Sequence, residues 1–213
     1  MSVSRTRASG PSPRKNNRGR PATPFLREKV LRSASELFAE QEFDSVLVDQ
    51  VAARAGVGKG SVYRQFGSKE ELYAAAVIND LAQLQKEIRA ALDECTSQQD
   101  RIATIVRQTV RFFWSRRQFF ALLRDPKALP RRQERQYRMQ RQELSRLVSD
   151  VLDDALKNGS LRPSLDTRIA AEAMLGMLRG INRYCRDFST PETAVATAMS
   201  IFLDGCVARD GAA

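Results

Sequence analysis

Two short helical patterns separated by Gly56 constrain the fold of this chain more than any other feature of its sequence. In the first pattern, apolar residues recur with the i, i+3, i+4, i+7 spacing of one helix face: Val48, Val51, Ala52 and Ala55. Gly56 follows, and glycine ends a helix at little cost because it readily adopts the left-handed conformation. In the second pattern, Val62 and Phe66 lie four residues apart and therefore point the same way, toward the first helix. The stretch predicts a helix-turn-helix, whose second helix presents its outer side chains to a DNA major groove.

The residues of this stretch resemble the N-terminal DNA-binding domain of the TetR (tetracycline repressor) family. The resemblance covers roughly residues 27 to 75, and it rests on glycines, aromatic residues and apolar residues at the family's offsets: Phe43, Val48, Val51, Ala52, Ala55, Gly56, Val57, Lys59, Gly60, Ser61, Val62, Tyr63, Phe66, Ser68 and Lys69. Two positions depart from the family pattern. Leu47 stands where a Thr or Ser usually caps the first helix, and Glu42 replaces the usual Gly. We expect the missing cap to cost about 1 kcal/mol unless Ser45 substitutes for it.

The resemblance also implies which residues bind DNA. Six positions match the family's contacts: Lys59, Gly60 and Ser61, near bases or backbone at the start of the second helix, and Tyr63, Gln65 and Lys69, at phosphates. A helix from Lys59 to Phe66 would be about 12 Å long, which is comparable to the width of a major groove. Double-stranded DNA is therefore the expected partner of this surface.

An enzymatic function is not supported by the sequence. Part of the stretch looks like a phosphate-binding loop, but that motif needs glycine where this chain has Ala53 and Ser or Thr where it has Gly60. The chain contains no histidine, the commonest general base and metal ligand. Its three cysteines, Cys95, Cys185 and Cys206, share no metal-binding spacing. We therefore expect no catalytic residues, no metal site and no cofactor.

Residues 1–24 form a basic N-terminal arm in the sequence. The arm contains six basic side chains and no acidic one, and it is rich in Ser, Pro and Gly without apolar periodicity. Such a composition predicts disorder in the free protein. Within the arm, the segment from Arg18 to Pro21 resembles an AT-hook core, whose arginines enter a narrow minor groove. We expect Arg18 and Arg20 to contact DNA, and a non-specific basic tail is the alternative.

The remainder of the chain predicts helices throughout, which makes the expected fold class all-α. A first helix at Phe25–Gln41 would complete a three-helix DNA-binding domain over residues 25–71. A long connecting helix from Glu70 to about Cys95 would follow, with Ser68 and Glu71 spaced as a capping box. Breaks at Gly and Pro place the other helices near 100–117, 118–124, 131–157, 165–187 and 192–208. Their order resembles the family's larger ligand-binding and dimerisation domain, here residues 72–213.

The last two predicted helices are expected to form a dimer interface. They combine small residues, which allow close helix packing, with large apolar ones. In the family, these two helices pair with those of a second copy; a core within one chain is the alternative. The residues expected at the interface are Gly176, Gly180, Ala198, Ile201, Phe202 and Gly205. A two-fold homodimer would match the symmetry of a palindromic operator.

Aromatic residues and arginines occur together in the middle of the chain, where residues 101–146 carry thirteen basic and three acidic side chains. The plain interpretation is that the aromatics are core and the arginines are solvated. The sharper hypothesis is a cavity for an amphipathic anionic ligand, with one or two arginines at its mouth and with these lining residues: Phe113, Phe120, Tyr137, Met174 and Met177. A membrane-surface or adaptor role for the basic segment is a rival hypothesis, although its interleaved Gln and Glu residues fit water better than lipid.

These features together predict a sequence-specific DNA-binding transcriptional regulator. We expect a homodimeric repressor that a small-molecule effector releases from a palindromic operator. No apolar run approaches the ~18 residues of a membrane helix, and no apolar segment follows the basic N-terminus. A cytoplasmic protein without a membrane partner is therefore expected.

Overall fold

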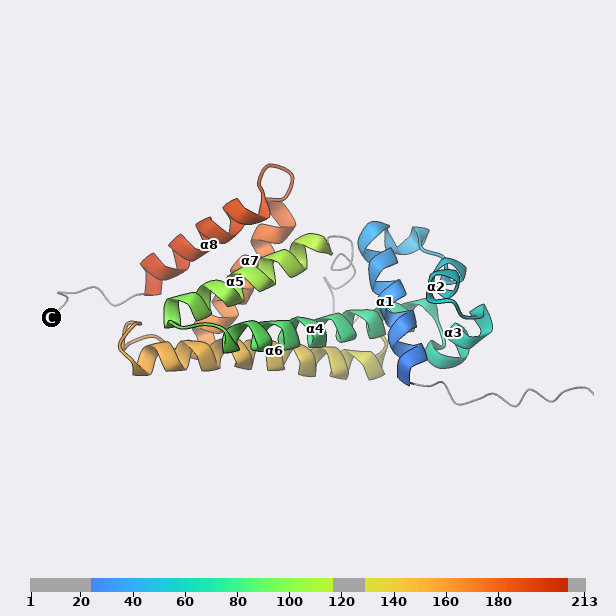
Figure 1. The fold of residues 1–213 in the computed structure, drawn as a ribbon, viewed down its shortest axis with the longest axis horizontal. Helices are drawn as coiled ribbons and strands as arrows, with labels where there is room; N and C mark the ends of the chain where they lie inside the picture. Colours follow the sequence, from blue (N-terminus) through green and yellow to red (C-terminus); the bar gives the residue numbers. More distant parts are fainter. Residues whose placement is uncertain (1–23, 117–128, 207–213) are drawn as a thin grey trace, which may run out of the picture.

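The computed structural model describes residues 24–116 and 129–206. Within these residues the chain forms eight α-helices and one short 3-10 helix, and no β-strand. Three helices, α1 (Pro24–Glu40), α2 (Val48–Ala55) and α3 (Lys59–Phe66), form a compact unit at one end of an elongated molecule (Figure 1). The all-α class and the N-terminal three-helix arrangement are confirmed.

Five further helices form a bundle at the other end: α4 (Lys69–Asp93), α5 (Gln98–Ser115), α6 (Arg131–Lys157), α7 (Thr167–Tyr184) and α8 (Pro191–Cys206). Each of the five begins and ends within three residues of its predicted bounds. The further helix predicted near 118–124 lies outside the described residues. None of the helices described is long and apolar enough to cross a membrane.

The three-helix unit is held together by the apolar face that α1 turns inward. That face consists of five buried side chains: Val30, Leu31, Ala34, Leu37 and Phe38. The ring of Phe38 packs edge-on against Tyr73 of α4, with centroids 4.9 Å apart, and stacks on Phe43 at 5.8 Å. Phe43 belongs to the 3-10 helix, η1 (Phe43–Ser45), that joins α1 to α2. One aromatic cluster therefore ties α1 to η1 and to the start of α4.

The turn between α2 and α3 has the predicted geometry. Gly56 has φ 67° and ψ 36°, the left-handed conformation in which residues other than glycine are strained. Its backbone N–H closes the end of α2 by donating to the carbonyls of Ala52 and Ala53. The chain then turns, and α3 packs its apolar side against α2.

The start of α2 lacks a side-chain cap because Leu47 occupies the N-cap position. Only half of a capping box is formed, since the Gln50 side chain accepts the Leu47 backbone N–H at 2.8 Å. The Leu47 side chain is 59% exposed, so it contributes little to the core. No described hydrogen bond brings the Ser45 hydroxyl to this helix end.

Replacing Leu47 with threonine is expected to stabilise the protein. Leu47→Thr would supply a hydroxyl that accepts from the free N–H groups of the first turn, which raises the free energy of unfolding by about 1 kcal/mol. Urea denaturation of the purified protein measures the change. Leu47→Ala is the matched control, because it removes the same exposed leucine without adding an acceptor. Equal stability of the two variants would contradict the prediction.

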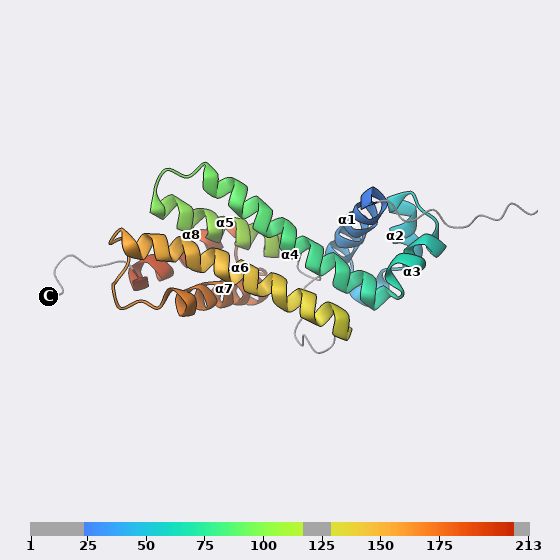
Figure 2. The ribbon, with the colours of Figure 1, turned by 90° about the horizontal axis from the view of Figure 1, so that it is seen from below.

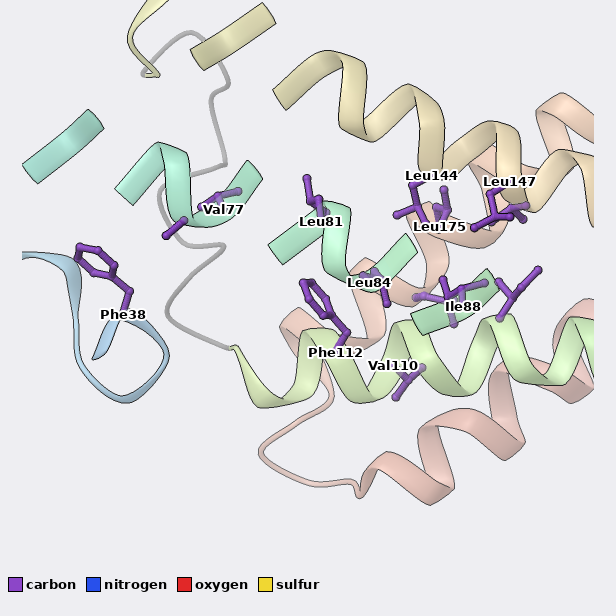
Figure 3. Close-up of a cluster of buried hydrophobic side chains, with 14 of the residues drawn as sticks. Phe38, Val77, Leu81, Leu84, Ile88, Val110, Phe112, Leu144, Leu147 and Leu175 are labelled. Carbon is purple, nitrogen blue, oxygen red and sulfur yellow. The ribbon is translucent and has the colours of Figure 1, made fainter. Parts of the chain in front are cut away.

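The long helix α4 connects the two ends of the molecule. The Ser68 hydroxyl caps it by accepting the Glu71 N–H at 3.1 Å, as the sequence predicts. Its first turns pack on α1 and α3, and the rest packs on α5 and α6 (Figure 2). Figure 3 shows a row of α4 side chains, among them Leu81 and Leu84, buried against the neighbouring helices. The DNA-binding unit and the bundle therefore share one helix, and the predicted boundary between residues 71 and 72 falls inside it.

Candidate nucleic-acid interface

The helix α3 presents one face to the core and leaves the opposite face open. Val62 and Phe66 are buried at 1% and 5% exposure, which fixes the rotation of the helix about its axis. Gly58 forms the N-cap, and its carbonyl accepts the Ser61 N–H at 2.8 Å. Tyr63, in contrast, is 42% exposed on the outer face. A two-turn helix locked on one side and open on the other is suited to insertion into a groove.

The six positions that the sequence assigns to DNA contact lie on α3 and at the start of α4. Lys59, Gly60 and Tyr63 are exposed, and the other three are partly buried: Ser61, Gln65 and Lys69. All except Lys69 belong to α3, and Lys69 begins α4 directly after it. Their contacts with DNA stay a prediction.

Lys59 is oriented by an acidic residue that sequence reasoning missed. Its ammonium group donates to the Asp49 carboxylate of α2 at 3.0 Å. This hydrogen bond and the negative charge of Asp49 raise the pKa of the Lys59 ammonium, so the group stays charged. Asp49 lies in the first turn of α2, where an acidic residue also interacts favourably with the helix dipole. No local sequence signal pointed to this pair, because the contact depends on how α2 and α3 pack.

Gly60 has no role in packing within the protein. A Cβ atom added at Gly60 would meet no other atom within 4 Å, and its φ lies outside the left-handed range. Glycine in a helix costs up to about 1 kcal/mol relative to alanine. The benefit of a bare backbone at this position must therefore come from outside the chain. Close approach of another molecule to the start of α3 would provide it.

Lys69 contacts the protein's own surface. Its ammonium group donates to the backbone carbonyl of Asp44 at 3.2 Å and lies 4.5 Å from the centroid of the Phe43 ring. These contacts hold the side chain over η1. A cation held in place loses less conformational entropy when it binds a phosphate than a freely moving one.

Arg18 and Arg20 of the basic arm lie outside the described residues, so their contacts with DNA stay a prediction. Phe120, one of the residues predicted for a ligand cavity, also lies outside the described residues. Among the described residues, no group of acidic, cysteine or histidine side chains could hold a metal ion.

The other predicted cavity residues lie on three neighbouring helices of the bundle. Met174 on α7 is buried at 1% exposure, and three more pack partly buried against the core: Phe113, Tyr137 and Met177. Burial raises the pKa of the Tyr137 hydroxyl, which therefore stays neutral. A separate open groove lies between α6 and the start of α7, and none of these residues lines it. That groove is rich in carboxylates, including Asp150. The aromatic ligand cavity stays a prediction.

The residues predicted for a dimer interface fall into two groups. Ile201 is 57% exposed and Gly205 is exposed, and Gly176 and Gly180 are half-buried with open space at their Cβ positions. The remaining two are buried at 0% and 6% exposure: Ala198 and Phe202. These two belong to the protomer's own core, because α8 turns that side toward α5. The surface open to a second copy therefore does not include them.

Two known families match successive parts of the chain. Residues 30–76 match the family described as "Bacterial regulatory proteins, tetR family". Residues 95–187 match "Tetracyclin repressor-like, C-terminal domain". Together the two matches span about two thirds of the chain. Both families consist of regulatory proteins and not of enzymes.

Relatives of known sequence agree with this assignment. The chain is 28% identical over 163 residues to the HTH-type transcriptional regulator YdeS of Bacillus subtilis, which covers 76% of this chain and 80% of YdeS. It is 35% identical to the HTH-type transcriptional activator FasR of Mycolicibacterium smegmatis over 80 residues. This alignment covers 38% of this chain and 36% of FasR.

Solved structures share the fold. The regulator FadR of Bacillus halodurans superposes with a TM-score of 0.70 at 18% identity, covering 87% of this chain and 98% of FadR. FadR of Bacillus subtilis, solved in complex with stearoyl-CoA, superposes with a TM-score of 0.69 at 14% identity, covering 84% and 98%. With both family matches and the helix-turn-helix geometry in place, the chain belongs to the TetR family of DNA-binding transcriptional regulators.

Proposed function

We propose that this regulator acts as a homodimeric repressor, which binds a palindromic operator and is released by a small-molecule effector. The open face of α3 carries the proposal for DNA. The buried residues of α3 fix the orientation of the helix, and its outer face offers Lys59, Tyr63 and an unobstructed backbone at Gly60. These are the donors and the clearance that a helix needs in a major groove.

Exposed apolar side chains on α7 and α8 support the dimer. Ile169 and Tyr184 on α7 are 68% and 67% exposed, and Ile201 on α8 is 57% exposed. Exposed apolar area on adjoining helices is typical of a protein interface. Gly176 and Gly180 lie between the two α7 residues and would let a second copy approach closely. Two copies would place two α3 helices about 34–36 Å apart, the spacing of successive major grooves.

The proposed effector is an amphipathic anionic small molecule bound in the bundle. Support comes from the stearoyl-CoA complex of Bacillus subtilis FadR, whose fold the chain shares. A titration of stearoyl-CoA into a fluorescent operator complex tests this class. We expect the anisotropy to fall as DNA is released, and no release by this or any other amphipathic acid would contradict the proposal. A reporter gene in a deletion strain separates repression from activation, because loss of a repressor raises expression.

Gly60→Ala tests the DNA surface directly. We expect the free energy of unfolding to stay unchanged or to rise by up to about 1 kcal/mol, because alanine is the better helix former. We expect operator affinity to fall by about tenfold or more, because the added methyl group occupies the space that DNA would approach. Urea denaturation and fluorescence anisotropy measure the two effects on one protein sample. Unchanged affinity would show that DNA does not come close to this part of α3.

A further inference from the structure

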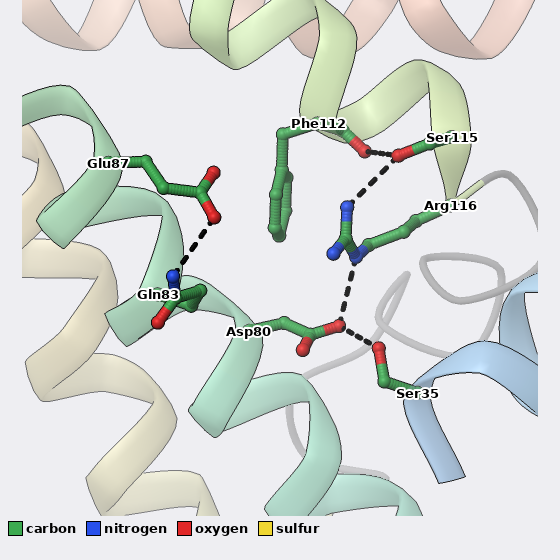
Figure 4. Close-up of polar contacts among 7 residues, drawn as sticks. All are labelled: Ser35, Asp80, Gln83, Glu87, Phe112, Ser115 and Arg116. Carbon is green, nitrogen blue, oxygen red and sulfur yellow. Dashed lines mark hydrogen bonds and ion pairs between the residues drawn. The ribbon is translucent and has the colours of Figure 1, made fainter. Parts of the chain in front are cut away.

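A buried carboxylate lies where the DNA-binding unit meets the bundle. Asp80 of α4 is only 5% exposed, and its Oδ2 atom accepts two hydrogen bonds from different helices (Figure 4). One donor is the hydroxyl of Ser35 on α1, and the other is the Nε atom of Arg116, 3.0 Å away, at the end of α5. One oxygen atom therefore links three helices through donors that lie 45 and 36 residues from Asp80 in the sequence.

Arg116 is itself held firmly at the end of α5. Its guanidinium carbon lies 4.3 Å from the centroid of the Phe112 ring, and its NH1 group donates to the Ser115 hydroxyl at 3.0 Å. That hydroxyl in turn donates to the Phe112 carbonyl at 3.0 Å. Arg116 consequently moves with the last turn of α5, to which all these groups belong.

The carboxylate depends on both donors. Burial raises the pKa of the Asp80 carboxyl, and the Ser35 hydroxyl and the Arg116 guanidinium oppose that shift because both favour the charged form. Apolar residues surround this position along α4, and Val77 and Leu81 are buried there. Well-packed apolar residues often replace a buried ion pair without loss of stability. What the carboxylate adds at this position is a set of directed hydrogen bonds to α1 and to the end of α5.

Fixing an angle requires more than one attachment. The three-helix unit packs on the bundle mainly through the first turns of α4. Because that packing involves a single helix of the bundle, the unit can change its angle to the bundle when α4 bends or tilts, whereas a bond to a second helix restricts this change. The bond chain Ser35–Asp80–Arg116 supplies this second attachment, since it reaches from α1 to α5.

We propose that Asp80 is a positioning residue, which transmits the position of the α5 end to the DNA-binding unit through Ser35 and Arg116. A shift of the last α5 turn by about 1 Å would carry Arg116 beyond hydrogen-bond distance and free the unit to pivot. Operator affinity would fall because the two α3 helices would lose their fixed spacing. This inference rests on the proposed dimeric regulator, and it names the contact through which the effector acts.

The distance between the two DNA-binding units in the free dimer tests the inference. Double electron–electron resonance measures that distance between spin labels attached at Ala53→Cys, on the exposed side of α2. The labelled protein carries serine in place of its native cysteines, and its operator affinity must match that of the wild type. For Arg116→Gln we expect a broader distance distribution and an operator affinity at least tenfold lower. The salt dependence of binding should stay unchanged, because the phosphate contacts made by the α3 surface are kept.

Two further variants separate positioning from folding. Gln85→Leu removes an equally buried polar contact of α4, in which the amide donates to the Gln140 carbonyl at 2.9 Å within the bundle. It should keep a narrow distribution and wild-type affinity. The double variant Asp80→Leu, Arg116→Met replaces the buried pair by apolar groups, so it should fold stably yet keep the broad distribution.

A narrow distribution and wild-type affinity in the folded double variant would overturn the inference. A narrow distance distribution and wild-type operator affinity in Arg116→Gln, with only the thermal stability lowered, would also overturn it, because Asp80 would then serve stability alone. If the proposed function itself is wrong, neither the wild type nor any variant binds a palindromic duplex, which distinguishes that failure from the outcomes above.

Discussion

Phe38→Ala is expected to unfold the DNA-binding unit and to abolish operator binding. The Phe38 side chain is 1% exposed and contacts the rings of Phe43 and Tyr73, so its removal opens a cavity where α1, η1 and α4 meet. Truncation of a buried phenylalanine to alanine lowers the free energy of unfolding by about 3–5 kcal/mol. Native domains are stable by only about 5–15 kcal/mol, so a loss of this size can exhaust the stability of a small three-helix unit.

Urea denaturation monitored by circular dichroism measures the loss. Phe25→Ala is the matched control, since it removes a phenylalanine from the same helix that is 65% exposed. The control should change the free energy of unfolding by no more than about 0.5 kcal/mol. A Phe38→Ala protein as stable as the control would show that the aromatic cluster does not support the unit.

Tyr63→Ala is expected to weaken operator binding by about 10- to 100-fold without unfolding the protein. The Tyr63 ring lies on the open face of α3, and the backbone carbonyl of Tyr63, which accepts the Gly67 N–H at 2.8 Å, is kept in the variant. A hydrogen bond to a charged group such as a phosphate contributes about 1.5–3 kcal/mol, which corresponds to this range of affinity.

Fluorescence anisotropy with an operator duplex measures the effect, and thermal melting checks the fold. Tyr63→Phe serves as the matched variant, because it keeps the ring and removes only the hydroxyl. If the hydroxyl binds a phosphate, the phenylalanine variant should lose most of the affinity that the alanine variant loses. Wild-type affinity in Tyr63→Ala would remove Tyr63 from the DNA surface.

The local features of the fold could be predicted because they depend on nearby residues. The helix-turn-helix follows from apolar spacing around Gly56, and the N-cap of α4 follows from Ser68. The bounds of α6 match their prediction, since Pro130 precedes the helix and Asn158 and Gly159 follow it. Each of these signals acts within a few residues along the chain.

Features that depend on distant partners were not predictable in the same way. Asp80 interrupts an apolar face, but its two donors lie 45 and 36 residues away in the sequence. The sequence of α8 is small and apolar on more than one side, so it did not show that Ala198 and Phe202 turn inward. The tether of Lys59 to Asp49 likewise depends on the angle between α2 and α3, which no local pattern encodes.

The central claim is that this chain reads a palindromic operator as a dimer. Selection of fragments from the source genome by the purified protein tests it most directly, with the double variant Tyr63→Ala, Lys69→Ala as the control. We expect the wild type alone to enrich a palindrome whose half-sites lie about one helical turn apart. Enrichment of non-palindromic AT-rich DNA by both proteins, or no enrichment by either, would contradict it.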